Sequence, residues 1–172
     1  MRIFFFVLAF AASLTASGEL SGRRAPGFSL IDVNFKQHDP QDYRGKILLV
    51  ELMQTGCPHC AQFSAILEEA VAKYKGQVVA VSIVNPPDTI ASIKQYIAER
   101  KITIPVLLDC GQVAGSYMTG YPRKLDFDIP HLFVIDAQGM IHNDFGYSPL
   151  TKGIFEGRDL FTELDGMIGK SK

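Results

Sequence analysis

The sequence predicts an α/β fold in which a mixed central sheet is flanked by helices. Segments typical of buried strands alternate with helical segments between residues 46 and 121, which favours parallel strands joined by helical crossovers. Two further strand segments, 131–135 and 140–145, are separated by the turn-forming residues 136–139, which predicts an antiparallel hairpin. An amphipathic helix closes the chain, so the elements form layers around one sheet.

The strands are predicted from short apolar runs. Residues 46–53 (KILLVELM) are almost continuously apolar, which is typical of a central strand covered on both faces. Residues 78–84 (VVAVSIV) predict a second buried strand, and residues 105–109 a third and shorter one. Apolar and polar residues alternate only in part over residues 28–33, which predicts an edge strand or one arm of a hairpin.

The helices are predicted from apolar residues that recur at helical spacing. Residues 63–74 carry one such stripe. Asp88 is a candidate N-cap for a second helix, and residues 113–121 predict a short third one. A single final helix is expected to present the apolar residues between positions 154 and 168.

Length and composition indicate one globular domain, expected over residues 25–172. The chain has 172 residues, of which 47% are hydrophobic and 20% are charged. The net charge is −1 and lysine and arginine form no cluster, which argues against nucleic-acid binding.

The first residues have the pattern of a secretory signal peptide. Met1-Arg2 is followed by an apolar run and then by small residues. A buried N-terminal element is one alternative, and a membrane anchor is another, although the run is too short to cross a bilayer unaided. We expect residues 1–17 to be removed and residues 18–24 to form a flexible leader. The mature protein would then be periplasmic or otherwise exported, with no stable membrane span.

The chain has three cysteines, Cys57, Cys60 and Cys110. A disulfide scaffold needs an even number of cysteines and more of them, so this class of protein is excluded. The spacing of Cys57 and Cys60 serves zinc as well as redox chemistry, but the sequence offers no second pair of ligands at metal spacing. The pair follows a strand and opens a helix, which favours a redox dithiol. We expect Cys110 to be an inert, partly buried thiol; the alternative is a resolving or cross-linking thiol.

The expected start of a helix at Pro58 gives the two cysteines different chemistry. If Cys57 is the N-cap, its sulfur faces unpaired amide groups and the positive end of the helix dipole, which stabilise a thiolate. Cys60 lies inside the helix, where fewer donors are free. Cys57 is therefore expected to be the nucleophile and Cys60 to resolve the mixed disulfide.

His59 lies between the two cysteines and is a candidate for the same chemistry. It can donate a hydrogen bond or positive charge to the Cys57 thiolate, which makes the disulfide a stronger oxidant. The alternative is an exposed helix residue without a role.

Glu51 interrupts an apolar strand that is expected to be buried. Burial raises the pKa of a carboxyl group unless it is hydrogen-bonded. Such an acid can take the proton of Cys60 through a water molecule. The alternative is a structural carboxylate satisfied by Lys75 or Tyr74.

The motif Cys57-Pro58-His59-Cys60 after one strand, with Ile129-Pro130 before another, resembles the thioredoxin superfamily. The surrounding sequence is similar to the exported TlpA/ResA-like and AhpC/TSA "redoxin" branch. The similar segments are residues 25–30 (APGFSL), 43–46 (YRGK), 105–109 (PVLLD) and 133–136 (FVID) with Gly139.

The resemblance implies a thioredoxin-like fold with an N-terminal extension and an extra strand–helix insertion. It also implies that Pro130 is a cis-proline beside the dithiol and that Glu51 stands where such proteins often keep an acidic residue. The dithiol sequence is typical of DsbA, a periplasmic oxidant, but the helical domain of DsbA has no counterpart here. The candidate catalytic residues are Cys57, Pro58, His59, Cys60, Glu51 and Pro130.

Two positions depart from the family pattern. Gly56 stands where an aromatic residue is usual, and His131 follows the expected cis-proline in place of a small hydroxyl residue. Both positions belong to the partner-binding surface of the family. His131 is also a candidate for additional positive charge near Cys57.

The predicted function is thiol–disulfide exchange outside the cytoplasm, without a cofactor or metal, by a monomer that acts on protein thiols or disulfides and on a redox partner protein. A redoxin-type peroxidase is one alternative. Its nucleophile needs a Thr or Ser three residues earlier and a Pro seven earlier, where Cys57 has Gln54 and Val50, and Cys60 has Cys57 and Met53. The other alternative is a copper(I)-binding, metallochaperone-like protein, since soft thiolates suit that metal.

Overall fold

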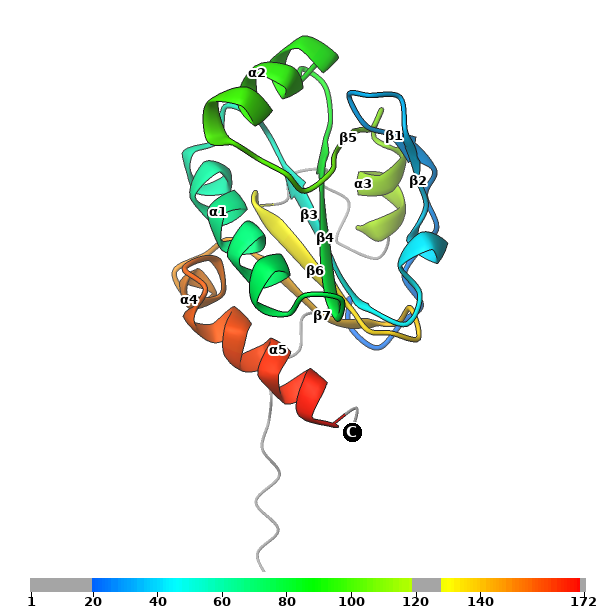
Figure 1. Ribbon diagram of the computed structural model, residues 1–172, viewed down its shortest axis with the longest axis vertical. Helices are drawn as coiled ribbons and strands as arrows, with labels where there is room; N and C mark the ends of the chain where they lie inside the picture. The colour runs from blue at the N-terminus through cyan, green and yellow to red at the C-terminus, as the bar shows by residue number, and fades with distance from the viewer. Residues whose placement is uncertain (1–19, 119–127, 171–172) are drawn as a thin grey trace, which may run out of the picture.

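A five-stranded mixed sheet forms the centre of the structure, a computed structural model that describes residues 20–118 and 128–170 (Figure 1). The strands lie in the order β5-β4-β3-β6-β7. They are β3 (Ile47–Met53), β4 (Val78–Val84), β5 (Val106–Leu108), β6 (His131–Ile135) and β7 (Ile141–Gly146). Strand β4 is parallel to β3 and β5, whereas β6 is antiparallel to β3 and β7. The mixed sheet with β3 at its centre is confirmed.

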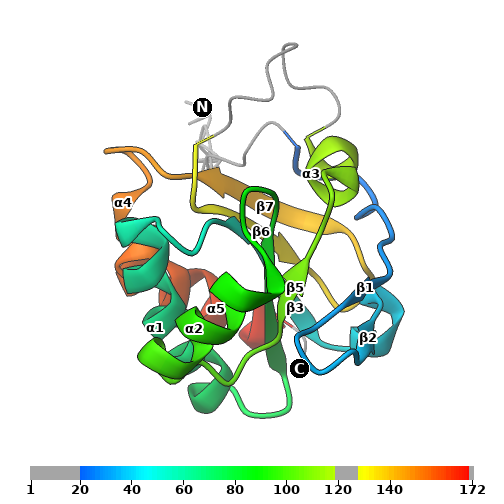
Figure 2. The same ribbon diagram turned by 90° about the horizontal axis from the view of Figure 1, so that it is seen from above.

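Helices and an N-terminal hairpin cover the two faces of the sheet (Figure 2). One face carries α1 (Pro58–Lys73), α2 (Ile90–Arg100), α4 (Lys152–Phe155) and α5 (Arg158–Lys170). The other carries α3 (Gln112–Tyr117), the hairpin of β1 (Leu30–Ile31) and β2 (Gln37–His38), and the 3-10 helix η1 (Pro40–Tyr43). The hairpin is the expected N-terminal extension, and α2 with β5 occupies the stretch in which the insertion was expected.

The side chains of β3 alternate between the two buried clusters of the protein. Leu49 and Met53 pack on the side of α1, whereas Leu48, Val50 and Leu52 pack on the side of α3. All seven residues of the strand are buried. This burial on both faces explains why the strand is an almost continuous apolar run.

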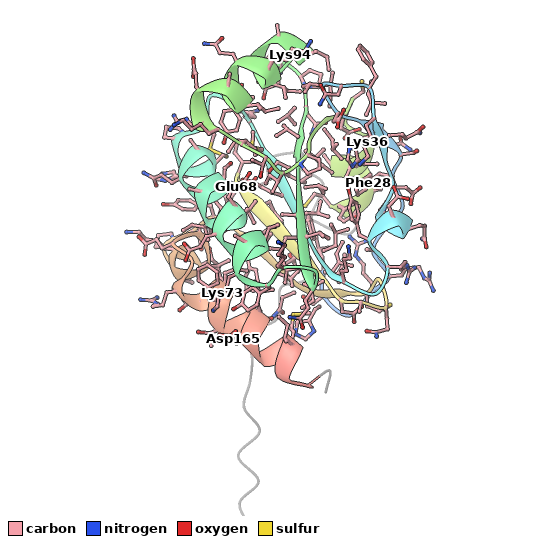
Figure 3. All side chains as sticks on the ribbon, in the orientation of Figure 1. Phe28, Lys36, Glu68, Lys73, Lys94 and Asp165 are labelled. Carbon is pink, nitrogen blue, oxygen red and sulfur yellow. A yellow bond between two sulfur atoms is a disulfide. The ribbon has the colours of Figure 1, made fainter. Side chains whose placement is uncertain are left out.

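Helix α5 packs beside α1 through apolar residues and a small polar contact. Leu160 and Leu164 are fully buried in the cluster under α1. The Tyr74 hydroxyl donates to Asp165 (2.7 Å), and Lys73 Nζ lies 3.5 Å from the same carboxylate (Figure 3). Because an exposed ion pair contributes only about 0–1 kcal/mol, the two leucines supply most of the stabilisation.

Three helix boundaries differ from those expected. Thr89, not Asp88, is the N-cap of α2, because its hydroxyl accepts a backbone hydrogen bond within the first turn. The expected single C-terminal helix is two helices, α4 and α5, because Gly157 between them has a φ of +91°. The helix expected over 113–121 is α3, which begins at Gln112 and ends at Tyr117 with Met118 as its C-cap; residues 119–121 lie outside the described part of the chain.

The residues before the first strand are attached to the sheet. The Gly22 N–H donates to the Ile141 carbonyl, and the Ile141 N–H donates to the Arg23 carbonyl, both at 2.8 Å. These bonds occupy backbone groups of β7 that an edge strand would leave unpaired. The expectation of a flexible leader over residues 18–24 is therefore wrong for residues 20–24.

Replacement of Gly157 should destabilise the fold. An added Cβ would lie 3.0 Å from the Phe161 ring and 3.2 Å from Ile66, at a backbone φ that side chains rarely adopt. We expect Gly157→Ala to lower the free energy of unfolding by about 1–3 kcal/mol. In the control, Gly166→Ala in α5, the Cβ meets nothing within 4 Å, so stability should rise by about 0.5–1 kcal/mol. Urea unfolding measures both variants, and equal stabilities would contradict this account.

Candidate active site

Cys57 and Cys60 form a disulfide at the start of α1. Cys57 is the N-cap and Pro58 is the first helical residue, as the sequence predicts. The Cys60 N–H donates to the Cys57 sulfur at 3.1 Å. Cys57 is partly exposed, whereas Cys60 is fully buried. An incoming thiol therefore reaches Cys57, and the helix amide that faces its sulfur stabilises the thiolate released later.

The loop between β3 and α1 is held by an acidic residue from the segment before α2. The Asp88 carboxylate accepts hydrogen bonds from the Thr55 amide (3.0 Å) and from the Thr55 hydroxyl. The Cys57 N–H donates to the Gln54 carbonyl at 3.1 Å. Asp88 thus fixes the approach to the dithiol, a contact that local sequence does not reveal.

Glu51 is fully buried in the middle of β3, on the sheet face that packs against α1. Its register partner in β4 is Ser82, whose hydroxyl donates to Glu51 Oε2 at 2.6 Å. Glu51 Oε1 is buried without a hydrogen-bond partner among the described residues. Burial raises the pKa of Glu51 to about 8, and the Ser82 bond opposes this only in part. A neutral, proton-carrying carboxyl group therefore lies under the helix that carries Cys60.

The structural alternative for Glu51 differs from the one expected. The Tyr74 hydroxyl donates to Asp165 and to the Phe161 carbonyl rather than to Glu51. Ser82 was missed, although it interrupts an apolar strand just as Glu51 does. Two polar residues inside adjacent buried strands are a signal that sequence reasoning can use, because parallel register can bring them together.

A second buried polar group lies behind Cys60. The Ser64 hydroxyl donates to the Cys60 carbonyl (3.0 Å) and lies 2.6 Å from the Tyr96 hydroxyl of α2. Burial raises the pKa of Tyr96, and its hydrogen bond with Ser64 opposes this in part. Helices α1 and α2 thus join two buried hydroxyl groups to the Cys60 carbonyl, another arrangement that the sequence did not predict.

His59 and Pro130 are connected by a residue that sequence reasoning missed, Tyr147. The His59 ring stacks on the Tyr147 ring, with centroids 4.2 Å apart and planes 22° from parallel. The Tyr147 N–H donates to the Pro130 carbonyl at 3.0 Å. The Ile129–Pro130 peptide is cis, as the resemblance implies. Since the following residue pairs with Leu52 near the end of β3, Pro130 lies at the dithiol end of the sheet.

His131 lies on the opposite face of the sheet from the dithiol. Its ring packs on Phe133, with centroids 4.7 Å apart, and its Nε2 lies 3.5 Å from the Asp144 carboxylate. Asp144 also accepts a hydrogen bond from the Leu20 amide. The expectation that His131 adds positive charge near Cys57 is wrong, because side chains alternate along a strand and the sheet lies between the two groups.

Cys110 is an exposed free thiol between β5 and α3, so the expectation of a partly buried thiol is wrong. The neighbouring Asp109 is buried and accepts a hydrogen bond from the Val113 amide, whereas Cys110 itself lies on the exposed side of the loop. We expect Cys110→Ser to leave the rate of dithiol exchange within a factor of about two, because a surface substitution away from the site changes little. Turnover of a reduced protein substrate measures this rate, and a tenfold loss would place Cys110 in the mechanism.

Comparison with known proteins agrees with this geometry. The AhpC/TSA family model matches residues 21–143. The chain belongs to the AhpC/TSA family. Over 121 residues it is 26% identical to "Thiol-disulfide oxidoreductase ResA" of Bacillus thuringiensis; the match covers 70% of this chain and 66% of that protein, just under two thirds. "Thioredoxin-like protein YneN" of Bacillus subtilis is 26% identical over 138 residues, with 78% and 76% coverage.

The fold of this AhpC/TSA chain is shared with solved thioredoxin-like structures. One is the thioredoxin domain of a thiol-disulfide oxidoreductase from Bacteroides vulgatus, with a TM-score of 0.66 and 18% identity. The alignment covers 84% of this chain and 96% of that domain. The predicted thioredoxin-like fold is therefore confirmed.

Proposed function

We propose that this protein is a thiol–disulfide oxidoreductase that exchanges disulfides with protein thiols through Cys57 and Cys60, without a cofactor. One observation carries the proposal: the disulfide joins a solvent-accessible N-cap sulfur to a fully buried sulfur three residues later. Because only the Cys57 sulfur is accessible to solvent, a partner thiol can attack the disulfide at Cys57 but not at Cys60. The relatives named as thiol-disulfide oxidoreductases support the same chemistry.

The reaction proceeds in two thiol–disulfide exchange steps. A partner thiolate attacks the Cys57 sulfur, a bond between these two sulfurs forms, and the Cys57–Cys60 bond breaks with Cys60 as the leaving thiolate. The second partner thiolate then attacks the partner sulfur of this mixed disulfide and releases Cys57. The partner loses two electrons and becomes a disulfide, and the protein becomes a dithiol. The reduced protein runs the same steps in reverse on a partner disulfide.

Neighbouring groups stabilise each released sulfur. The start of α1 and the Cys60 N–H favour the Cys57 thiolate. Glu51 is protonated below a pH of about 8, so it supplies a proton to Cys60 when that sulfur leaves and accepts it again in the reverse direction. His59 favours the thiolate of Cys57, which makes the disulfide form relatively oxidising. The cis-proline Pro130 completes the partner-binding edge.

The site of action and the partners also belong to this proposal. The N-terminal pattern supports export and removal of residues 1–17, which lie outside the described part of the chain. No helix among residues 20–118 and 128–170 is long and apolar enough to cross a membrane. We propose a monomer whose domain, predicted over residues 25–172 and joined at β7 by residues 20–24, acts outside the cytoplasm on protein thiols or disulfides. A redox partner protein then restores its initial redox state.

Catalysed reduction of insulin by dithiothreitol and oxidation of a reduced dithiol peptide test the proposal. The protein should accelerate both reactions, and Cys57→Ser should abolish the acceleration. Rapid consumption of hydrogen peroxide with no insulin reduction would instead support a peroxidase. Tight copper(I) binding with no exchange activity would support a metallochaperone.

A further inference from the structure

The imidazole of His59 is held by an aromatic ring from a distant part of the chain. His59 is the second residue of α1 and is exposed, a position in which a side chain normally samples several rotamers. Here its ring stacks face to face on Tyr147, which follows β7, with centroids 4.2 Å apart. The contact covers one face of the imidazole and fixes its plane.

Tyr147 is itself fixed on two sides. Its N–H donates to the Pro130 carbonyl at 3.0 Å. The edge of its ring packs on Phe155, with centroids 5.4 Å apart, and Phe155 packs in the same way on Phe63 of α1 at 4.8 Å. Phe155 and Phe63 are buried, so this run of rings is anchored in the core under α1. Tyr147 is thus a rigid support for an otherwise mobile histidine.

The stack prepares His59 to interact with the Cys57 thiolate. A fixed imidazole loses less entropy when it donates a hydrogen bond to this thiolate than a freely rotating one does. This effect acts on the reduced state, because the disulfide has no thiolate to accept the bond.

We propose that Tyr147 is a positioning residue of the dithiol site. It fixes the ring of His59 within the Cys57–Cys60 loop, is itself bonded to the Pro130 carbonyl, and stabilises the reduced form of the couple. This inference rests on the proposed function. It assigns part of the redox potential to a residue outside the dithiol motif and 88 positions after His59.

The equilibrium of the purified protein with glutathione tests the inference. Tyr147→Leu removes the aromatic face but keeps an apolar contact for Phe155, and Tyr147→Phe keeps the face and removes only the hydroxyl. We expect Tyr147→Leu to shift the equilibrium constant about two- to fivefold toward the disulfide, a potential about 10–20 mV more negative. Tyr147→Phe should remain at the wild-type potential. Tyr147→Met is the second variant if the leucine variant does not fold.

A His59→Leu background separates positioning from packing. If Tyr147 acts through His59, Tyr147→Leu leaves the potential of the His59→Leu protein unchanged. An equal shift in both backgrounds, or a loss of unfolding free energy with no shift in either, would overturn the inference. In both of these outcomes the wild-type protein still equilibrates with glutathione and reduces insulin. A wild-type protein that does neither would overturn the proposed function instead.

Discussion

Cys60→Ser should stop the reaction at the mixed disulfide. In the proposed mechanism, partners reach the Cys57 sulfur, and the buried Cys60 thiol releases them. Without the buried thiol, a partner disulfide attacked by Cys57 stays attached, because the serine hydroxyl is not a nucleophile for a disulfide. We expect catalytic turnover of insulin to fall to the uncatalysed rate, with one covalent adduct formed per protein chain. Mass spectrometry of the adduct and the insulin assay measure the two effects.

Matched cysteine variants show which sulfur carries the adduct. Cys110→Ser combined with Cys60→Ser should still form one adduct per chain, whereas Cys57→Ser should form none at the dithiol. Peptide mapping should place the partner on Cys57. Near-normal turnover by Cys60→Ser, or an adduct that maps to Cys110, would contradict the assignment of roles.

Glu51→Gln should change the pH dependence of stability. The pKa of Glu51 is about 8 in the folded protein against an ordinary value of 4.5. Between these values the folded state binds a proton that the unfolded state has lost, so wild-type stability falls as the pH rises from about 4.5 to about 8. Glutamine keeps an oxygen that accepts from Ser82 and does not titrate. The free energy of unfolding of the variant should therefore rise relative to that of the wild type across this pH range. The relative increase should be on the order of a few kcal/mol at pH 8 and above.

Urea unfolding of the oxidised proteins at several pH values between 4 and 9 measures this difference. The control is Glu69→Gln on the exposed side of α1, which should give a nearly constant difference of a few tenths of a kcal/mol. A Glu51→Gln difference that does not vary with pH would show that folding leaves the pKa of Glu51 near its ordinary value.

The same variant should slow the chemistry. Loss of the proton donor to Cys60 is expected to lower the rate of insulin reduction at pH 7 by about 10²-fold, the low end of the range for general acid–base catalysis. Stopped-flow oxidation of a dithiol peptide by the disulfide form isolates the step in which Cys60 leaves. An unchanged rate would leave Glu51 as a purely structural carboxyl group.

Local patterns predicted much of the fold and the centre of the site. The apolar run of β3 and the apolar stripe over residues 63–74 are sufficient to place a central strand and the helix that follows it. A strand buried on both faces is apolar throughout, and a helix buried on one side has apolar residues at helical spacing. The Cys57-Pro58 sequence at this junction predicts an N-cap sulfur from helix geometry alone. Glu51 is visible as a charge inside an apolar run.

The remaining features depend on contacts between distant residues. The Glu51–Ser82 bond requires the register of β3 and β4, and the His59–Tyr147 stack requires the end of β7 to lie beside α1. The orientation of His131 depends on which face odd positions of β6 occupy, and a one-residue change would reverse it. None of these follows from residues adjacent in the chain.

Titration of the protein in glutathione redox buffers, with alkylation and mass measurement of each cysteine, tests the central claim most directly. The account predicts one reversible two-electron transition that converts Cys57 and Cys60 together, at a potential more positive than the roughly −270 mV of thioredoxin. Cys110 should be absent from this transition. A Cys57–Cys60 pair that never equilibrates with glutathione, or that reacts only as separate thiols, would contradict it.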